Sequence, residues 1–397
     1  MGAIQAIDNV YYVGVQDKDL RVFDIIMHSD YGTSYNSYLV RGSEKTALFE
    51  TCKLEFWDEY IANIREVCDP SEIDYIVVNH TEPDHAGCME RLLELAPNAK
   101  VLGSSTALTF LKEIVNHPFP SQAVTEADQI DLGGLTLTFL SVPFLHWPDS
   151  MYTYIPELKA LFSCDSFGCH YADDRVFNDL IDGDFTDAYL YYFTHIIGPF
   201  KRPFMTKALD KIAALDIQFI GNGHGPVLRS NIQKYLDMYR EWCAPQAKTG
   251  KDVVIAYVSA YGYTRSLAEA IAKGVKEAGV EVKLFDLVTD NAEEAKAAIA
   301  DADGFLLGSP TLVGDALPPV YDMMLGLNPI IHRGKFAGAF GSYGWSGEAV
   351  PNLVARMQQL KLSMPLEGMK IRFKPTEQDL DNAVSYGKQF AEAVLAK

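Results

Sequence analysis

The chain has 397 residues, of which 48% are hydrophobic and 22% charged, and its formal net charge is -19. This length exceeds what one hydrophobic core usually serves, so we expect two or three domains, and the composition excludes a disordered protein. The strong acidic charge opposes phosphate backbones and anionic lipid, so neither nucleic acid nor a membrane is expected as a partner.

Targeting and redox signals point to the cytoplasm. Residues 1–10 contain no basic stretch and no long apolar run of the kind that opens a signal peptide. No segment reaches the eighteen or more apolar residues of a membrane span. The six cysteines include no C-x-x-C pair, which argues against a zinc ribbon or a thioredoxin-like site. We therefore expect a soluble cytoplasmic protein with reduced thiols.

The first part of the chain mixes short strands with helices. Apolar, β-branched and aromatic runs predict strands, and longer amphipathic stretches predict helices between them. The predicted strands are residues 10–15, 37–40, 46–49, 73–78, 100–102, 135–140, 151–155, 160–163 and 217–220, and the predicted helices are 54–67, 88–95 and 184–215. Strand-rich ends with helices between them indicate an α+β or four-layer arrangement.

A polar segment at residues 243–252 contains Pro and Gly and is the predicted linker. After it, predicted strands and helices alternate regularly. We place the domains at 1–249 and 250–397. The predicted strands of the second domain are 253–258, 282–287, 304–308, 336–340 and 369–373, and its helices are 266–278, 292–300, 350–360 and 379–395. Five such strands predict a doubly wound parallel sheet.

A dense group of possible metal ligands follows the predicted strand 73–78. The segment H-T-E-P-D-H supplies His80, Glu82, Asp84 and His85 within six residues. Pro83 disfavours helix at the residue before it, so we expect an extended loop that leads into the next helix. Alternate residues of an extended segment point the same way, so three of these side chains can converge.

Three more candidate ligands each follow another predicted strand. They are His146, Asp165 and His224. Because strand ends gather at one edge of a sandwich, the loops that carry them can meet in a single cleft. A lone His in a loop is usually solvated, but three such residues together with the dense motif indicate a metal site.

Three loops at the carboxyl ends of the strands in the second domain are candidate ligand-binding loops. The first joins a strand to a helix N-terminus and is suited to a phosphate monoester, while aromatic residues in the third can stack on a flat ring. Neither G-x-G-x-x-G nor G-x-x-x-x-G-K-[ST] is present, so no dinucleotide or nucleoside triphosphate fingerprint is found. The residues are Ser259, Ala260, Tyr261, Gly262, Tyr263 and Thr264; Ser309, Pro310, Thr311, Leu312, Val313 and Gly314; and Ser342, Tyr343, Gly344, Trp345, Ser346 and Gly347.

The motif H-x-E-x-D-H, then a lone His, Asp and His, followed by these loops in order, resembles flavodiiron proteins. The resemblance implies a metallo-β-lactamase-like αββα sandwich followed by a flavodoxin-like doubly wound sheet that binds FMN. It implies one iron at His80, Glu82 and His146, a second iron at Asp84, His85 and His224, and a bridging Asp165. It further implies reduction of O2 to water or of NO to N2O, an external electron donor such as rubredoxin or a reductase, and a head-to-tail homodimer or a dimer of dimers.

The types of metal-ligand atoms help to distinguish a di-iron site from the alternative interpretations. Zinc relatives of the fold carry H-x-H-x-D-H, and Glu82 replaces that imidazole with a hard anionic oxygen, which suits iron or manganese. A metallo-β-lactamase-type zinc hydrolase is the first alternative, and Glu82 and the flavin domain argue against it. A flavin electron carrier with a vestigial metal site is the second. Whether His85 binds metal, whether His170 lines the cleft, and whether O2 or NO is preferred are left open.

Overall fold

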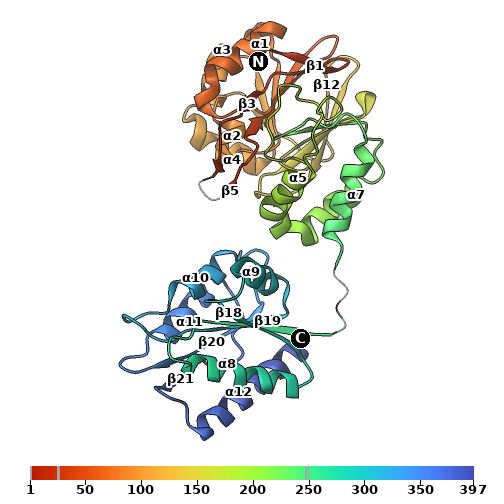
Figure 1. The fold of residues 1–397 in the computed structure, drawn as a ribbon. Coiled ribbons are helices and arrows are strands. Elements are labelled where there is room, and N and C mark those ends of the chain that lie inside the picture. Colours follow the sequence, from red (N-terminus) through yellow and green to blue (C-terminus); the bar gives the residue numbers. More distant parts are fainter. Residues whose placement is uncertain (1, 25–26, 246–247, 249) are drawn as a thin grey trace. The chain divides into compact units, whose positions relative to one another are not determined.

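The structure, a computed structural model, describes residues 2–24, 27–245, 248 and 250–397. The chain forms two compact units, Met1–Pro245 and Gln246–Lys397 (Figure 1). The expected two-domain organisation is therefore confirmed. The domain boundary predicted between residues 249 and 250, and parts of the linker predicted at 243–252, fall on positions outside the described residues, so the exact boundary stays a prediction.

Two stacked sheets form the centre of the first unit. Their facing sides bury a common apolar core, in which the rings of Phe49 and Phe162, one from each sheet, stack with centroids 4.0 Å apart. The larger sheet has the order β1 (Ile4–Ile7), β2 (Val10–Tyr12), β7 (Tyr38–Arg41), β8 (Thr46–Phe49), β9 (Tyr75–Val78), β10 (Lys100–Gly103), β11 (Ser121–Ala123). The smaller has the order β12 (Gln129–Asp131), β13 (Thr136–Ser141), β14 (Met151–Ile155), β15 (Ala160–Cys164), β16 (Phe219–Asn222).

Helices cover the outer faces of both sheets and complete the predicted four layers (Figure 1). On the larger sheet, Tyr60 and Leu92 pack against Leu48 in a second core. On the smaller sheet, the ring of Tyr239 lies 4.6 Å from that of Phe167. The helices are α1 (Trp57–Val67), α2 (Pro83–Ala86), α3 (Met89–Leu95), α4 (Ser105–Val115), α5 (Thr186–Tyr192), α6 (Thr206–Ile212) and α7 (Ile232–Cys243).

Several segments of the first unit differ from the sequence prediction, and α2, α7, β1, β11 and β12 were not predicted. The strand predicted at 10–15 ends at Tyr12, and a separate β3 (Val15–Asp17) pairs with β6 (Thr33–Tyr35) in a small ribbon, as β4 (Val22–Phe23) does with β5 (Met27–His28). The helical region predicted at 184–215 is broken into α5, short 3-10 and π turns, and α6, and Arg202 within it has extended backbone angles. Helix α4 was not predicted.

The second unit is a five-stranded parallel sheet with helices on both faces, as predicted. Alternate residues of each strand face opposite sides, so Ile255 packs toward α8 and α12 while Val254 packs toward α9, α10 and α11. The sheet order is β18 (Glu281–Asp286), β17 (Asp252–Tyr257), β19 (Gly304–Gly308), β20 (Phe336–Tyr343), β21 (Met369–Arg372). The helices are α8 (Tyr263–Glu277), α9 (Ala292–Asp301), α10 (Pro318–Leu325), α11 (Ala349–Gln359) and α12 (Glu377–Leu395), of which α10 was not predicted.

Two glycines allow α8 and α12 to pack backbone to backbone. A Cβ added at Gly274 would lie 1.9 Å from the Val384 carbonyl oxygen, and one at Gly387 would lie 2.1 Å from the Ile271 carbonyl oxygen. Neither contact can be relieved by rotating a side chain, because both obstacles are backbone. The close approach fixes α8, whose N-terminus belongs to the first candidate ligand-binding loop.

We expect Gly274→Ala to destabilise the second unit by about 1–3 kcal/mol, the usual cost of overpacking a tight contact. The measurement is urea denaturation followed by circular dichroism. Gly326→Ala is the matched control, because a Cβ at Gly326 meets nothing within 4 Å and the residue has a φ of -79°. Equal stability of the two variants would contradict this account of the helix contact.

Candidate metal centre and flavin-binding loops

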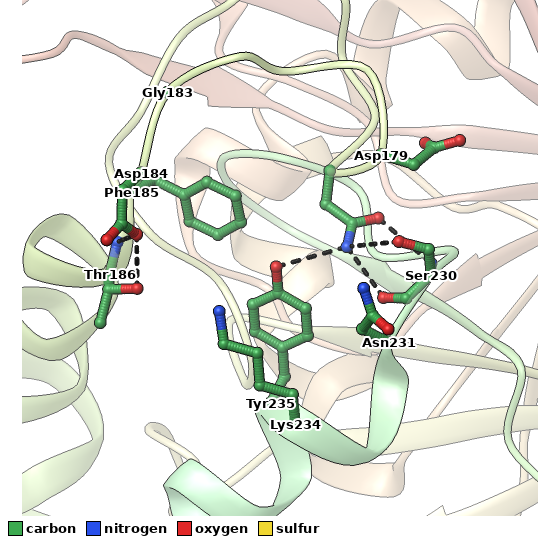
Figure 2. A pocket seen from close by; sticks show the side chains of 10 residues that line it. Asp179, Gly183, Asp184, Phe185, Thr186, Ser230, Asn231, Lys234 and Tyr235 are labelled. Carbon is green, nitrogen blue, oxygen red and sulfur yellow. Dashed lines mark hydrogen bonds between the residues drawn. The ribbon is translucent and has the colours of Figure 1, made fainter.

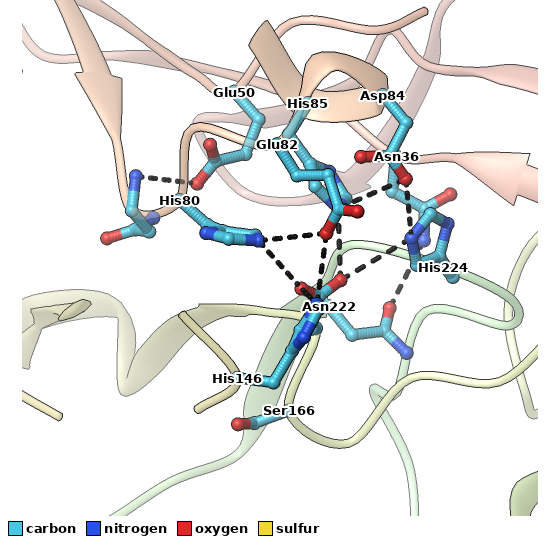
Figure 3. A network of polar contacts seen from close by, with 12 residues as sticks. Asn36, Glu50, His80, Glu82, Asp84, His85, His146, Ser166, Asn222 and His224 are labelled. Carbon is cyan, nitrogen blue, oxygen red and sulfur yellow. Dashed lines mark hydrogen bonds and ion pairs between the residues drawn. The ribbon is translucent and has the colours of Figure 1, made fainter. Parts of the chain in front are cut away.

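Seven predicted ligands converge at one end of the two stacked sheets of the first unit. His80 follows β9 in the larger sheet, whereas Asp165 and His224 follow β15 and β16 in the smaller one. His146 lies in the loop after β13, Glu82 is the N-cap of α2, and α2 itself carries Asp84 and His85. The donor atoms fall into two neighbouring groups, each with its atoms within 4.8 Å of one another: His80, Glu82, His146 and Asp165, and Asp84, His85 and His224 (Figure 3).

Pro83 shapes the motif differently from the expectation of a fully extended loop. Glu82 is extended, with φ -56° and ψ 142°, as predicted for a residue before proline. Pro83, however, is the first residue of the short helix α2, a position where proline is favoured because its missing N–H is not needed. Asp84 and His85 therefore lie on a helical turn and reach the second group of ligands, while His80 and Glu82 belong to the first.

The carboxylate of Asp165 connects the two groups through its two oxygens. Oδ2 lies 3.4 Å from the Nε2 atoms of both His80 and His146. Oδ1 lies 3.0 Å from His85 Nε2 and 3.4 Å from His224 Nε2. One carboxylate that offers one oxygen to each of two ligand sets has the geometry of a bridge between two metal ions.

The other carboxylates complete the two sets. Glu82 Oε2 lies 3.2 Å from His80 Nε2 and 3.0 Å from His146 Nε2. Asp84 Oδ2 lies 3.2 Å from His224 Nε2 and 3.6 Å from His85 Nε2. Each set thus combines two imidazoles with one carboxylate of its own and one oxygen of the shared carboxylate. Cys164 Sγ also lies within 4.8 Å of donor atoms of His85 and Asp165. Burial raises the pKa of this thiol well above the usual value, which opposes a thiolate ligand.

The pKa values of the buried histidines and carboxylates in the cluster are shifted by their contacts with one another. Burial lowers the pKa of His146, but its contacts with Asp165 and Glu82 outweigh this effect and raise the pKa to about 9. His224 behaves alike, and its pKa rises to about 10 because of Asp165 and Asp84. Burial raises the pKa of Asp165, yet the surrounding imidazoles, His85 first, hold it well below the usual value. The carboxylates thus draw positive charge to this site, and a bound metal ion would take the place of the imidazole protons, because histidine binds metal as the neutral ring.

Three buried residues outside the predicted set lie around the ligands, and two of them, Asp149 and Tyr192, contact a ligand directly. Asp149 accepts hydrogen bonds from the backbone N–H and hydroxyl of Thr81, both 2.8 Å, and its oxygens lie 3.3 Å from His80 Nδ1. The Tyr192 hydroxyl donates to Asp165 Oδ1 at 3.0 Å. Glu50 is buried at the end of β8 and accepts the Asn79 N–H at 2.9 Å. Only Asp149 had a sequence signal, as an acidic residue three positions after a candidate ligand.

His170 is a neighbour of the cluster and not a member of either ligand group. Its ring centroid lies 5.4 Å from that of His224 and 4.2 Å from that of Phe23, and its Nδ1 is 2.9 Å from the Thr33 hydroxyl. Burial lowers the pKa of His170 well below the usual value. It also lines a small cavity of about 190 Å³ together with residues that include His28.

A separate cavity of about 510 Å³ lies between the loop before α5 and the start of α7 (Figure 2). Its polar groups are largely used within the protein, since the Asn178 amide donates to the Ser230 carbonyl at 2.9 Å and contacts the Tyr235 hydroxyl at 3.3 Å. None of the predicted site residues lines this cavity. The size of a cavity is therefore a poor guide to the chemistry of this unit.

The three predicted loops of the second unit follow adjacent parallel strands, β17, β19 and β20. Helix α8 begins at Tyr263, three residues earlier than predicted, because Gly262 adopts a left-handed φ of 84° at its N-cap. The N-cap residue Gly262 has no capping side chain, although the Arg265 N–H donates to the Ser259 hydroxyl at 3.2 Å. The N–H groups that precede Arg265 are the ones that an anion would meet. This is the expected arrangement for binding a phosphate.

Within these loops the exposed residues can contact a ligand, whereas the buried residues bond to other parts of the protein. Tyr261 and Trp345 are 80% and 92% exposed, so both rings are free to stack on a planar ligand. Thr264 and Ser342 are buried, and their hydroxyls lie 2.9 Å apart. The buried Ser309 hydroxyl accepts the Leu317 N–H at 2.9 Å. The predicted serine and threonine contacts therefore include residues that hold the loops in shape.

The remaining loop residues form turns around this crevice. Leu312 and Asp315 exchange backbone hydrogen bonds of 3.0 and 3.1 Å, which makes Val313 and Gly314 the tip of a tight turn, both with left-handed φ. The Val313 side chain is fully exposed there. Strand β20 continues to Tyr343, three residues beyond the predicted end, so part of the third loop is strand. The predicted positions Gly344, Ser346 and Gly347 follow it.

Together, a β-lactamase-like αββα unit with a two-part carboxylate and imidazole cluster and a flavodoxin-like parallel sheet define a two-domain redox architecture. Comparison with known proteins agrees. The ODP family beta lactamase profile matches residues 33–225, and the flavodoxin profile matches residues 255–387. Among the helices that the structure describes, none is both long and apolar enough to cross a membrane.

The chain belongs to the flavodiiron proteins. It is 41% identical to the flavo-diiron protein FprA2 of Clostridium acetobutylicum, over 99% of this chain and 100% of that protein. It is 37% identical to the nitric oxide reductase of Moorella thermoacetica, over 98% of each. Among solved structures, rubredoxin oxygen:oxidoreductase from Desulfovibrio gigas is similar with a TM-score of 0.71 and 32% identity, over 99% of each chain.

Proposed function

We propose that this protein is an oxidoreductase that reduces O2 to water, NO to N2O, or both, at a di-iron centre supplied with electrons by FMN. The observation that carries the proposal is the division of the two Asp165 oxygens between two complete ligand sets. A flavin and an iron pair each store two electrons, which together match the four that O2 reduction requires. The names of the relatives support both substrates, since one is a nitric oxide reductase and another an oxygen oxidoreductase.

The ligand assignment follows from the two groups of donors. We assign His80, Glu82 and His146 to one iron, Asp84, His85 and His224 to the other, and Asp165 to both. The donor set suits iron, because it combines hard carboxylate oxygens with imidazoles and contains no thiolate. The irons, when bound, would supply the redox chemistry at which O2 or NO is reduced. The protein holds their ligands in place and buries them away from bulk water.

We assign FMN to the crevice formed by the loops after β17, β19 and β20. The N-terminus of α8 fits a phosphate, and the exposed rings of Tyr261 and Trp345 can stack on the two faces of a flat ring system. The absence of a dinucleotide fingerprint in the sequence favours a mononucleotide. FMN would pass electrons singly or in pairs, and the chain's part is to place the flavin and shield it.

We also propose an electron donor, an oligomeric state and a cellular compartment for this protein. An external electron donor such as rubredoxin or a reductase fits the relative named for rubredoxin. We propose a head-to-tail homodimer or a dimer of dimers, which would bring the FMN of one chain to the irons of another, and sedimentation of the cofactor-loaded protein tests it. We place the protein in the cytoplasm, consistent with six free cysteines.

The deciding experiment is anaerobic reduction of the purified protein followed by separate O2 and NO assays on one preparation. We expect two irons and one FMN per chain and rapid consumption of at least one of the two gases. Metal analysis and the visible flavin spectrum are measured on the same sample. Two zinc ions per chain, or a fully reduced flavin with no gas consumption, would reject the proposal in favour of a hydrolase or of a simple electron carrier.

A further inference from the structure

The buried ligand histidines differ in what their Nδ1 atoms, which point away from the cluster, contact. His80 Nδ1 lies 3.3 Å from the Asp149 carboxylate, and His224 Nδ1 donates to the Ser34 carbonyl oxygen at 2.6 Å. His85 is equally buried, but its Nδ1 has no hydrogen-bond partner within the described residues. A metal-binding histidine normally donates this second N–H to a carboxylate, a carbonyl or a water, which fixes its tautomer and orientation.

Two further unpartnered polar atoms belong to residues beside His85. Glu50 uses Oε1 to accept the Asn79 N–H, but its Oε2 is buried with no partner found in the described parts of the chain. The Asn79 side-chain oxygen accepts the Thr153 hydroxyl at 2.8 Å. The Asn79 Nδ2 is buried with no partner at hydrogen-bond distance in the described residues, although the Asn79 side chain lies close enough to Glu50 to lower the pKa of its carboxyl. These three residues thus offer one unsatisfied acceptor and two unsatisfied donors, three of the nine unpartnered buried side-chain atoms among the described residues. Buried polar atoms without partners are rare, so a set of three requires an explanation.

The backbone brings Glu50 and His85 together. The backbone N–H and the hydroxyl of Thr51, the next residue, both donate to the His85 carbonyl oxygen, at 2.7 and 2.8 Å. Glu50 itself has a left-handed φ of 57°, a conformation that a non-glycine residue keeps only when its surroundings hold it there. Burial raises the pKa of the Glu50 carboxyl to about 7, and the charge of His85 is the strongest opposing influence. Figure 3 shows Glu50 with His80 and His85.

We propose that Glu50 is a positioning residue for the iron held by Asp84, His85 and His224, and that it acts on His85 through one buried water molecule. The water would accept hydrogen bonds from His85 Nδ1 and Asn79 Nδ2 and donate one to Glu50 Oε2. This satisfies all three atoms and gives the water three partners, the usual number for a buried water. The inference rests on the proposed function and deepens it by naming how this ligand is held.

The consequence for His85 is a defined tautomer. With its proton on Nδ1 and donated to the water, the imidazole presents the lone pair of Nε2 toward the carboxylates, 3.0 Å from Asp165 Oδ1. Glu50 would then do for the second iron what Asp149 does for the first. On this proposal His85 binds the second iron through Nε2.

The test is Glu50→Gln in the iron-loaded full-length protein. The amide would give the water three donors and only two lone pairs to receive them, so His85 would lose its fixed orientation. We expect the affinity for the second iron alone to fall by about 10–100-fold, the usual effect of losing such a support. Iron release to a ferrous chelator should become biphasic, and the Mössbauer spectrum of the retained iron should match that of a His224→Ala variant.

Asp149→Asn is the matched variant, because it removes the carboxylate behind His80 and should loosen the other iron. Unchanged iron release from Glu50→Gln, or equal acceleration for both irons, would overturn the proposal. A crystal structure of the wild-type protein gives a second test that does not depend on the variant folding. Density for a water bonded to Glu50, Asn79 and His85 supports the proposal, and its absence overturns it, even if the iron pair itself were not found.

Discussion

Asp165→Asn is expected to remove reduction of O2 and NO and to leave the protein with fewer than two irons per chain. The asparagine side chain has nearly the same shape, but only one of its two terminal atoms can bind a metal. Removing one member of a buried charge set costs about 3–5 kcal/mol. Since 1.36 kcal/mol corresponds to a factor of ten, we expect iron affinity to fall by about 10²–10⁴-fold. The flavin unit should still bind FMN.

Metal analysis, the flavin spectrum and the two gas-consumption assays measure this outcome. Asp182→Asn is the matched control, because it makes the same change of charge at a carboxylate that is 95% exposed and pairs with Arg175. The control should keep two irons and wild-type turnover. If Asp165→Asn did the same, the assignment of a bridging carboxylate would be wrong, and with it the central geometric argument for a di-iron site.

The ligand motif could be found from sequence because its chemistry is local. His80, Glu82, Asp84 and His85 lie within six residues directly after a buried strand, and the three later ligands each follow a strand of their own. Strand ends could be predicted within a few residues because apolar runs stop there. In the second unit the same reasoning placed all three loops, since ligands bind at the carboxyl ends of parallel strands.

The supporting residues could not be predicted because they depend on tertiary packing. Glu50 reaches the cluster only because β8 pairs with β9, and Tyr192 only because the end of α5 lies over the loop that carries Asp165. Nothing in their local sequence marks either residue. The short helix α2 was not predicted for another reason. Pro83 prevents helix at the residue before it and also starts helix α2, and sequence reasoning used only the first effect.

Glu82→His tests how the site selects its metal, because it converts the motif to the H-x-H-x-D-H form of the zinc relatives. Glu82 Oε2 lies 3.0 and 3.2 Å from the Nε2 atoms of His146 and His80, so its carboxylate is the one negative group that belongs to the first set alone. Replacing it with a neutral imidazole removes a charge and adds a softer nitrogen ligand. The side chain is 17% exposed, which leaves room for the ring to turn outward.

We expect Glu82→His protein, produced with equal iron and zinc in the medium, to contain zinc at the first set and to lose O2 and NO reduction. Zinc has no redox chemistry and readily accepts sites rich in imidazole. FMN should remain bound and reducible, so the flavin spectrum separates loss of metal chemistry from loss of fold. Glu90→His, at an exposed position of α3, adds a histidine without touching the cluster and should keep the wild-type metal content. Two irons and full turnover in Glu82→His would mean that the carboxylate does not choose the metal, and the preference for iron would then have to come from Asp84, Asp165 and the groups behind the imidazoles.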